Sequence, residues 1–160
     1  MKRQRLRARM DTKSIEVRHD LDTAVPYLVA RAGARMGQAF AKALKPFDLS
    51  LSEWRVCASL GNKPYQSLSE LVTHAAVDTS TLSRIVDRLV QQGLVSRQRS
   101  DLDGRAVRLC LTPEGATLTR KIAPLAKRYE KVALTGFTPQ EVQMLRALLV
   151  RLYDNAEPLA

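Results

Sequence analysis

Cysteine and histidine are scarce in this chain of 160 residues, which has two of each: Cys57, Cys110, His19 and His74. Two isolated cysteines cannot form a disulfide framework, so a reducing compartment is the simpler interpretation. A metal sensor needs clustered His, Cys or carboxylate ligands, and this set does not supply them. We therefore expect no bound metal and no cofactor.

Long apolar runs and phosphate-binding glycine patterns are also missing. No segment approaches the roughly 18 consecutive apolar residues of a membrane helix, and the basic stretch from Met1 to Arg9 is not followed by the apolar core of a secretory signal. The sequence has no Gly-rich phosphate loop, nucleophile elbow or paired carboxylates, and His74 fits a capping or surface position better than a catalytic base. These absences predict a cytoplasmic protein that is not an enzyme and has no catalytic residue.

Acidic residues are outnumbered: 26 Lys and Arg stand against 16 Asp and Glu, a net charge of +10. Residues 1–18 hold seven of the basic and two of the acidic side chains, a net +5. Such a charge attracts polyanions, and nucleic acid comes before membranes because no basic amphipathic stretch stands out. The alternative is a solubilising tail on an ordinary domain. In either case residues 1–20 are predicted to form a flexible basic arm.

Helix-start signatures occur at four places. Three have the capping-box form, in which a hydroxyl and a carboxylate three residues later satisfy each other's backbone amides: Ser50 with Glu53, Ser67 with Glu70, and Thr138 with Glu141. The fourth is Thr112 before Pro113, whose missing N–H costs nothing at the first helical position. Gly61 and Gly93 fit C-terminal caps. The predicted helices are 23–45, 52–61, 68–75, 79–92, 113–135 and 139–155.

Between the fourth and fifth predicted helices, the apolar period changes from that of a helix to that of a strand. Segments 94–99 and 106–111 flank Asp103-Gly104, and an Asp-Gly pair between two such segments is a strong hairpin signal. Alternation along the second segment places Cys110 on its outward, accessible face. A β-ribbon directly after two short helices is a wing. The predicted fold is mainly α with a small β-wing, a winged helix-turn-helix lobe accompanied by long helices.

The helix that follows Asp78 has two contrasting faces. An apolar stripe at helical spacing is predicted to face the core. The N-terminal end of such a helix enters the major groove in helix-turn-helix proteins, where arginine can grip guanine. The alternative is a solvated surface helix, and arginines on the wing argue against it. The predicted DNA contacts are Thr79, Ser80, Thr81, Ser83, Arg84 and Arg88 on the helix, with Arg99 and Arg105 on the wing.

Several short stretches together resemble the MarR family of winged-helix regulators. They are 51–56 (LSEWRV), 69–71 (SEL), 79–89 (TSTLSRIVDRL), 92–97 (QGLVSR), 101–105 (DLDGR) and 111–115 (LTPEG), and their order and spacing are more specific than any one of them. The similarity runs from about Leu21 to Asn155. It implies an obligate dimer, held by the first, fifth and sixth helices, with two winged lobes. It also implies one domain at 21–160, with the winged helix-turn-helix at about 50–112 and dimerisation helices at about 21–46 and 113–156.

The outer helices support a homodimer independently. The first and last helices carry more large apolar side chains than so small a lobe can bury. A symmetric dimer would cover them and would match the two-fold symmetry of palindromic operators. Packing of these helices on their own lobe is the alternative. The side chains are Tyr27, Leu28, Met36, Phe40 and Leu44 in the first helix and Val142, Leu145, Leu148, Leu149, Leu152 and Tyr153 in the last.

The resemblance also implies regulation by a small molecule. Family members often bind aromatic acids or related anions in a cleft beside the DNA-binding lobe, and Trp54 with Arg31 and Arg35, one turn apart, would suit such a ligand. The alternative is that Trp54 belongs to the core and both arginines are solvated. Thiol sensing is a further alternative, but the family's oxidant sensors carry their cysteine in the first helix, where this chain has none. Cys57 is expected to be buried and inert.

Two classes of function follow. In the first, the protein is a sequence-specific transcriptional regulator, a repressor of palindromic operators that a small anionic or aromatic ligand releases from DNA. In the second, it is a ligand-independent winged-helix module that binds DNA nonspecifically or binds protein. Ser80, Ser83 and Arg84 at the reading end of the helix favour the first class. The predicted partners are double-stranded DNA, a second copy of the chain and a small-molecule effector, with no membrane.

Overall fold

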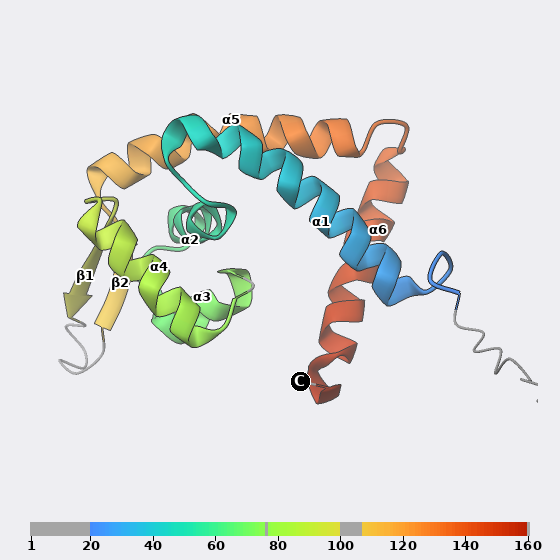
Figure 1. The fold of residues 1–160 in the computed structure, drawn as a ribbon, viewed down its shortest axis with the longest axis horizontal. Coiled ribbons are helices and arrows are strands. Elements are labelled where there is room, and N and C mark those ends of the chain that lie inside the picture. Colours follow the sequence, from blue (N-terminus) through green and yellow to red (C-terminus); the bar gives the residue numbers. More distant parts are fainter. Residues whose placement is uncertain (1–19, 76, 100–106, 160) are drawn as a thin grey trace, which may run out of the picture. The chain divides into compact units, whose positions relative to one another are not determined.

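The computed structural model describes residues 20–75, 77–99 and 107–159. The chain divides into two units, residues 1–34 and 35–160, and helix α1 (Val25–Leu44) begins in the first and ends in the second (Figure 1). Residues 1–19 of the predicted arm, the predicted turn at Asp103-Gly104 and Arg105 lie outside the described residues. The described parts are mainly helical with one two-stranded antiparallel ribbon, which confirms the predicted fold class.

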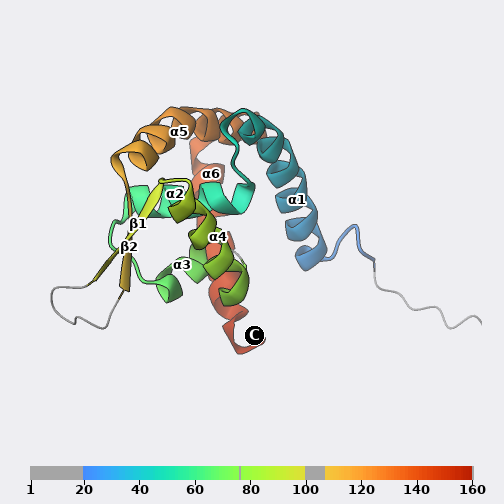
Figure 2. The ribbon, with the colours of Figure 1, turned by 60° about the vertical axis from the view of Figure 1, so that its left-hand side comes forward.

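The second unit contains the remaining elements. A short 3-10 turn, η1 (Lys45–Phe47), leads from α1 to the helix-turn-helix, and the ribbon separates that motif from two longer helices. Figures 1 and 2 both show α3 and α4 beside α2, with the strands next to one end of α4. Each predicted helix is present, with its ends within a couple of residues of the prediction. The elements are α2 (Leu51–Asn62), α3 (Leu68–Ala75), α4 (Thr79–Gln91), β1 (Val95–Arg99), β2 (Val107–Leu111), α5 (Pro113–Ala133), α6 (Pro139–Asn155) and η2 (Glu157–Leu159).

The predicted capping boxes form the starts of three helices. At the start of α2, Ser50 Oγ accepts the Glu53 N–H at 3.2 Å, and Glu53 Oε2 accepts the Ser50 N–H at 2.7 Å. The same exchange opens α3 and α6. Each exchange satisfies backbone amides that the first turn of a helix leaves without an acceptor. The local sequence therefore determines where these helices begin.

The end of α4 and the start of α5 are joined at the base of the ribbon. Gly93, with φ +70°, closes α4 in a Schellman motif in which the Leu94 N–H donates to the Leu89 carbonyl at 2.9 Å. Thr112, the N-cap of α5, donates its N–H to the Leu94 carbonyl at 3.1 Å and its hydroxyl to the Gly93 carbonyl at 2.6 Å. A Cβ on Gly115 would collide with the Leu94 carbonyl oxygen. Glycine therefore allows the start of α5 to pack directly against the backbone of Leu94, just after the end of α4.

Gly61 does not end α2, so that part of the prediction was wrong. The helix continues through Gly61 to Asn62. A Cβ at this position would lie 3.3 Å from Thr119 Cγ2 on α5. Glycine at this position thus eases the packing of α5 beside α2, and in the sequence it is indistinguishable from a cap.

The core of the second unit lies where α2, α3 and α4 meet the ribbon. The apolar stripe of α4 faces this core, as predicted, since Leu82, Val86 and Leu89 are fully buried. An aromatic cluster adjoins it: the Phe40 ring meets Trp54 edge-on at 6.0 Å and Tyr129 at 5.3 Å between centroids. Other fully buried side chains include Leu44, Val56, Leu60, Leu71 and Ile122.

A residue between α2 and α3 extends the ribbon by one bridge. Gln66 exchanges both backbone hydrogen bonds with Leu109 of β2, at 3.2 and 2.8 Å. Its buried side chain donates to the Ser59 carbonyl at 3.0 Å. Gln66 thereby attaches the end of α2 to the wing. Sequence reasoning missed it because a single glutamine in a connection has no periodic signal.

Cys110 is buried rather than outward, contrary to the prediction. Its side chain is 7 % exposed, and its Sγ lies 3.1 Å from Ser96 Oγ on the neighbouring strand. Leu109 next to it is buried as well, because β2 contacts both α2 and α5. Alternation in the sequence cannot distinguish the covered base of a ribbon from a part that has one free face.

Candidate nucleic-acid interface

Helix α4 begins at an aspartate that orients two hydroxyl groups. Oδ1 of Asp78 accepts the Thr81 N–H at 2.8 Å and the Ser80 hydroxyl at 2.5 Å, and Oδ2 accepts the Thr81 hydroxyl at 2.6 Å. These hydrogen bonds, that of Ser80 first, hold the pKa of Asp78 below its usual range, so the carboxylate is ionised at neutral pH. Because both hydroxyl protons are donated to Asp78, the two oxygens keep lone pairs for donors from outside.

The predicted reading face of α4 is exposed near the start of the helix. Thr79, Ser80 and Arg84 are exposed, while Thr81 and Ser83 are partly buried. No carboxylate of the described residues lies within ion-pair distance of Arg84. The N-terminal half of α4 therefore offers hydroxyl acceptors and an arginine side by side.

Arg88, four residues further along α4, is engaged by another part of the chain. Its Nε lies 3.1 Å from Glu53 Oε1, and its Nη2 lies 3.6 Å from Asp48 Oδ2. The Glu53 side chain is 3 % exposed and that of Arg88 53 %. The capping-box pattern assigned Glu53 only to the start of α2. Its contact with Arg88 could not be foreseen because it depends on how α2 and α4 pack.

Two arginines of the ribbon, Arg97 in the middle of β1 and Arg108 near the start of β2, are also paired with carboxylates of the helix-turn-helix. Arg97 of β1 lies 2.6 Å from Asp87 of α4, and Arg108 of β2 lies 2.8 Å from Glu70 of α3. The backbone N–H of Ser67, above other hydrogen bonds, lowers the pKa of Glu70 to about 2. These ion pairs thus connect β1 to α4 and β2 to α3.

Two residues of the predicted wing, Arg99 and Arg105, are expected to contact DNA. Arg99 is the last residue of β1, and its side chain lies beyond what the structure describes. Arg105 is outside the described residues altogether. A DNA contact for either arginine stays a prediction.

The residues predicted to bind a ligand have different surroundings. Trp54 is 8 % exposed within the aromatic cluster, and Arg35 is exposed on α1. Arg31 belongs to the first unit, where it pairs with Asp22 at 3.4 Å. A ligand site formed by these residues stays a prediction.

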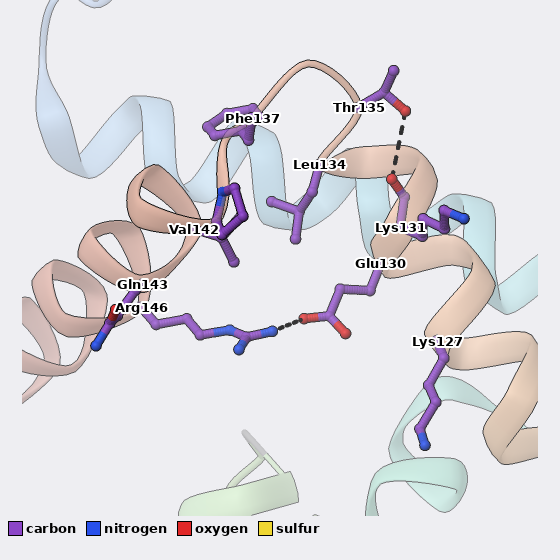
Figure 3. A pocket seen from close by; sticks show the side chains of 10 residues that line it. Lys127, Glu130, Lys131, Leu134, Thr135, Phe137, Val142, Gln143 and Arg146 are labelled. Carbon is purple, nitrogen blue, oxygen red and sulfur yellow. Dashed lines mark hydrogen bonds and ion pairs between the residues drawn. The ribbon is translucent and has the colours of Figure 1, made fainter.

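Helices α5 and α6 border a hollow of about 920 Å³ with basic and apolar walls (Figure 3). Arg146 of α6 reaches across it to Glu130 of α5 at 2.7 Å, and Phe137 lies on the connection between the helices. Within the described part of the chain, α6 buries none of its residues. The exposed apolar side chains of α6 are Met144, Leu148, Leu149, Val150, Leu152 and Tyr153.

The remaining candidate chemistry is sparse. Burial raises the pKa of the Cys57 thiol to about 12, and the nearby Glu53 charge acts in the same direction, so this cysteine is a poor nucleophile. Among the described residues, no group of three His, Cys, Asp or Glu side chains is placed to hold a metal ion. No helix in the same residues is long and apolar enough to cross a membrane.

Comparison with known proteins bears on the same residues. A family model described as "MarR family" matches residues 49–107, which include the helix-turn-helix and β1. The HTH-type transcriptional repressor IacR of Pseudomonas putida is 32% identical over 133 residues, covering 83% of this chain and 80% of IacR.

Solved structures agree over most of the chain. One of them is Bordetella bronchiseptica BpsR, whose structure was solved in a study of how 6-hydroxynicotinic acid regulates its DNA binding. It has a TM-score of 0.76 at 25% identity, covering 85% of this chain and 97% of BpsR. A mutant of E. coli MarR complexed with operator DNA has a TM-score of 0.69 at 26% identity, covering 79% of this chain and 91% of the other.

Proposed function

Because the chain belongs to the MarR family and is a DNA-binding transcriptional regulator rather than an enzyme, we propose that it is a homodimeric repressor of palindromic operators. A small anionic or aromatic ligand releases it from DNA. The name of IacR as a repressor supports the direction of control. The proposed DNA contacts are Thr79, Ser80, Thr81, Ser83 and Arg84 on α4, with Arg99 and Arg105 on the wing.

The exposed start of α4 is the observation that carries the proposal. Guanine presents O6 and N7 in the major groove, where an arginine such as Arg84 can bind both. Adenine and cytosine present exocyclic amino groups there, which need an acceptor. The Ser80 and Thr81 oxygens are suitable acceptors because Asp78 already takes their protons. We expect these hydroxyls to select an amino-bearing base.

The dimer is proposed because α6 leaves a continuous apolar face uncovered. Leu148, Leu149, Leu152 and Tyr153 lie at helical spacing, and each is at least 39 % exposed. Single soluble chains rarely expose such a face without a partner. A second copy of the chain would cover it and place two reading helices about a two-fold axis, which a palindromic operator requires.

The effector is proposed to be an aromatic acid or a related anion. BpsR, a structural relative, is reported to be regulated by 6-hydroxynicotinic acid, which is an aromatic acid. Arg31, Arg35 and Trp54 are the proposed ligand residues. A guanidinium would pair with the ligand's carboxylate, and the Trp54 edge would contact its ring.

Footprinting on the DNA that flanks the protein's own gene tests the proposal. We expect protection of a palindrome that is lost when one aromatic acid is added. Protection of all DNA alike, unchanged by any acid, would instead indicate the ligand-independent module.

Asp78→Asn tests the reading mechanism on the same operator. Asparagine caps helices as well as aspartate does, but its amide also donates, so at least one hydroxyl must turn its proton outward. We expect the preferred base at one position to change from adenine or cytosine to guanine or thymine, measured by binding to operators substituted one base pair at a time. The amide nitrogen would replace Oδ2, which accepts the Thr81 hydroxyl, so Thr81→Val is the matched control that removes an acceptor without creating a donor. A uniform loss of affinity with unchanged base preference would show that Asp78 acts only as a helix cap.

A further inference from the structure

Arg84 and Arg88 lie four residues apart on α4, so they project from the same side of the helix. Only Arg88 is engaged within the described residues, and its principal partner is a buried carboxylate. Both oxygens of Glu53 are used: Oε2 accepts the Ser50 N–H at 2.7 Å and Oε1 pairs with Arg88 Nε at 3.1 Å. A carboxylate that is only 3 % exposed needs such partners, because burying an unpaired charge is costly.

A second attachment lies beside the first. Asp48, between η1 and α2, has φ +51° and lies 3.6 Å from Arg88 Nη2 through its Oδ2. The same oxygen accepts the Gln92 side-chain amide at 3.4 Å. The connection between α1 and α2 is therefore attached to the C-terminal half of α4 through Arg88 and Gln92.

We infer that Arg88 is a positioning residue, held by Glu53 and Asp48 so that α4 keeps the rotation at which Arg84 meets the bases. The inference rests on the proposed function of α4 as the reading helix. It removes Arg88 from the predicted DNA contacts and gives Glu53, on another helix, a role in sequence selection. A planar guanidinium suits this role because it can meet two carboxylates with a fixed geometry.

Two single variants and their combination test this inference in the full-length chain. Glu53→Gln keeps the capping box, since glutamine can also accept the Ser50 N–H, but removes the charge that holds Arg88. Arg88→Met keeps the apolar stem and removes the guanidinium. Each variant is expected to lower the ratio of operator to random-DNA affinity by about tenfold, the size of a misplaced base contact, with no change in salt dependence. The double variant should lose no more than either single one, because the two side chains act as one unit.

The competing role for Arg88 is a phosphate contact. In that case Arg88→Met would weaken binding to both DNAs and reduce the slope of log K against log salt by about 0.9, while Glu53→Gln would bind as well as the wild type or better. That pattern would overturn the inference. Arg84→Met is the matched control on the same face, expected to lose operator preference whatever happens at Glu53.

Thermal unfolding and sedimentation show whether Glu53→Gln and Arg88→Met are folded. If either folds poorly, Arg88→Lys provides a third test. Lysine can contact a phosphate but cannot reproduce the two-carboxylate geometry. Loss of operator preference in Arg88→Lys supports positioning, and full retention overturns it. A wild-type protein that prefers no DNA sequence would refute the proposed function as a whole. Sequence preference in the wild type with uniform weakening in Arg88→Met would refute the inference alone.

Discussion

Gly115→Ala is expected to be strongly destabilising although it places a better helix former inside a helix. Gly115 lies in the first turn of α5, and the added Cβ would collide with the Leu94 carbonyl oxygen. That oxygen is backbone: it accepts the Thr112 N–H, and the N–H of the same residue, Leu94, is held in the Schellman motif that ends α4. A backbone oxygen cannot move away by a rotamer change, as the end of a side chain can. The start of α5 must therefore move away from the end of α4.

One favourable and two unfavourable contributions determine the magnitude. Alanine is more favourable than glycine in a helix by roughly 0.8–1 kcal/mol. Relieving an overpacked contact costs about 1–3 kcal/mol. Moving α5 also weakens the two hydrogen bonds that Thr112 donates to the Gly93 and Leu94 carbonyls, at about 1 kcal/mol each. The clash dominates, and we expect a net loss of about 2–4 kcal/mol in the free energy of unfolding.

Urea denaturation of the full-length protein measures this loss, at one protein concentration for all variants because the stability of the proposed dimer would depend on it. Gly61→Ala is the matched control, since its Cβ would meet only the side-chain tips of Thr119 and Leu111, at 3.3 and 3.6 Å. It should change the stability by less than about 1 kcal/mol in either direction. If Gly115→Ala proves as stable as Gly61→Ala, the close contact between the start of α5 and the Leu94 carbonyl oxygen is incorrect.

Three further predictions concern DNA binding. Arg84→Ala should cost about 1–3 kcal/mol on the operator and much less on random DNA in a binding titration, and equal losses would reduce Arg84 to a phosphate contact. Arg105→Ala should lower affinity and reduce the salt slope by about 0.9, whereas an unchanged slope would argue against a wing contact. Deleting residues 1–18 should weaken binding to specific and random DNA by similar factors while leaving the proposed dimer intact in sedimentation. Dissociation of that truncated protein would mean instead that the segment belongs to the dimer interface.

The elements themselves could be predicted from the sequence because their signals are local. The capping boxes at Ser50, Ser67 and Thr138 and the left-handed cap at Gly93 depend on residues within one helical turn of each other. The apolar stripe of α4 likewise has its period in the sequence. These features need no knowledge of what packs against them.

The errors and omissions share a different cause. Burial of Cys110, the passage of α2 through Gly61 and the pairing of Glu53 with Arg88 all depend on a neighbouring element distant in the chain. Residue type alone could not show that Arg88, unlike Arg84, pairs with a carboxylate of another helix. The sequence predicts that α4 meets DNA, but only the packed structure shows which of its polar side chains contact α2.

The hydrogen bond between Leu94 and Thr112 joins the two ends of the segment that forms the wing. The chain leaves the end of α4 at Leu94 and returns to it at Thr112, where the two residues are hydrogen-bonded at 3.1 Å. The relative placement of α4 and α5 is consequently independent of how many residues the ribbon contains between these points. Insertions or deletions in the ribbon can change its length while the end of α4 stays joined to the start of α5 through Leu94 and Thr112. The wing is thus free to diverge in length among relatives without a compensating change in the rest of the lobe.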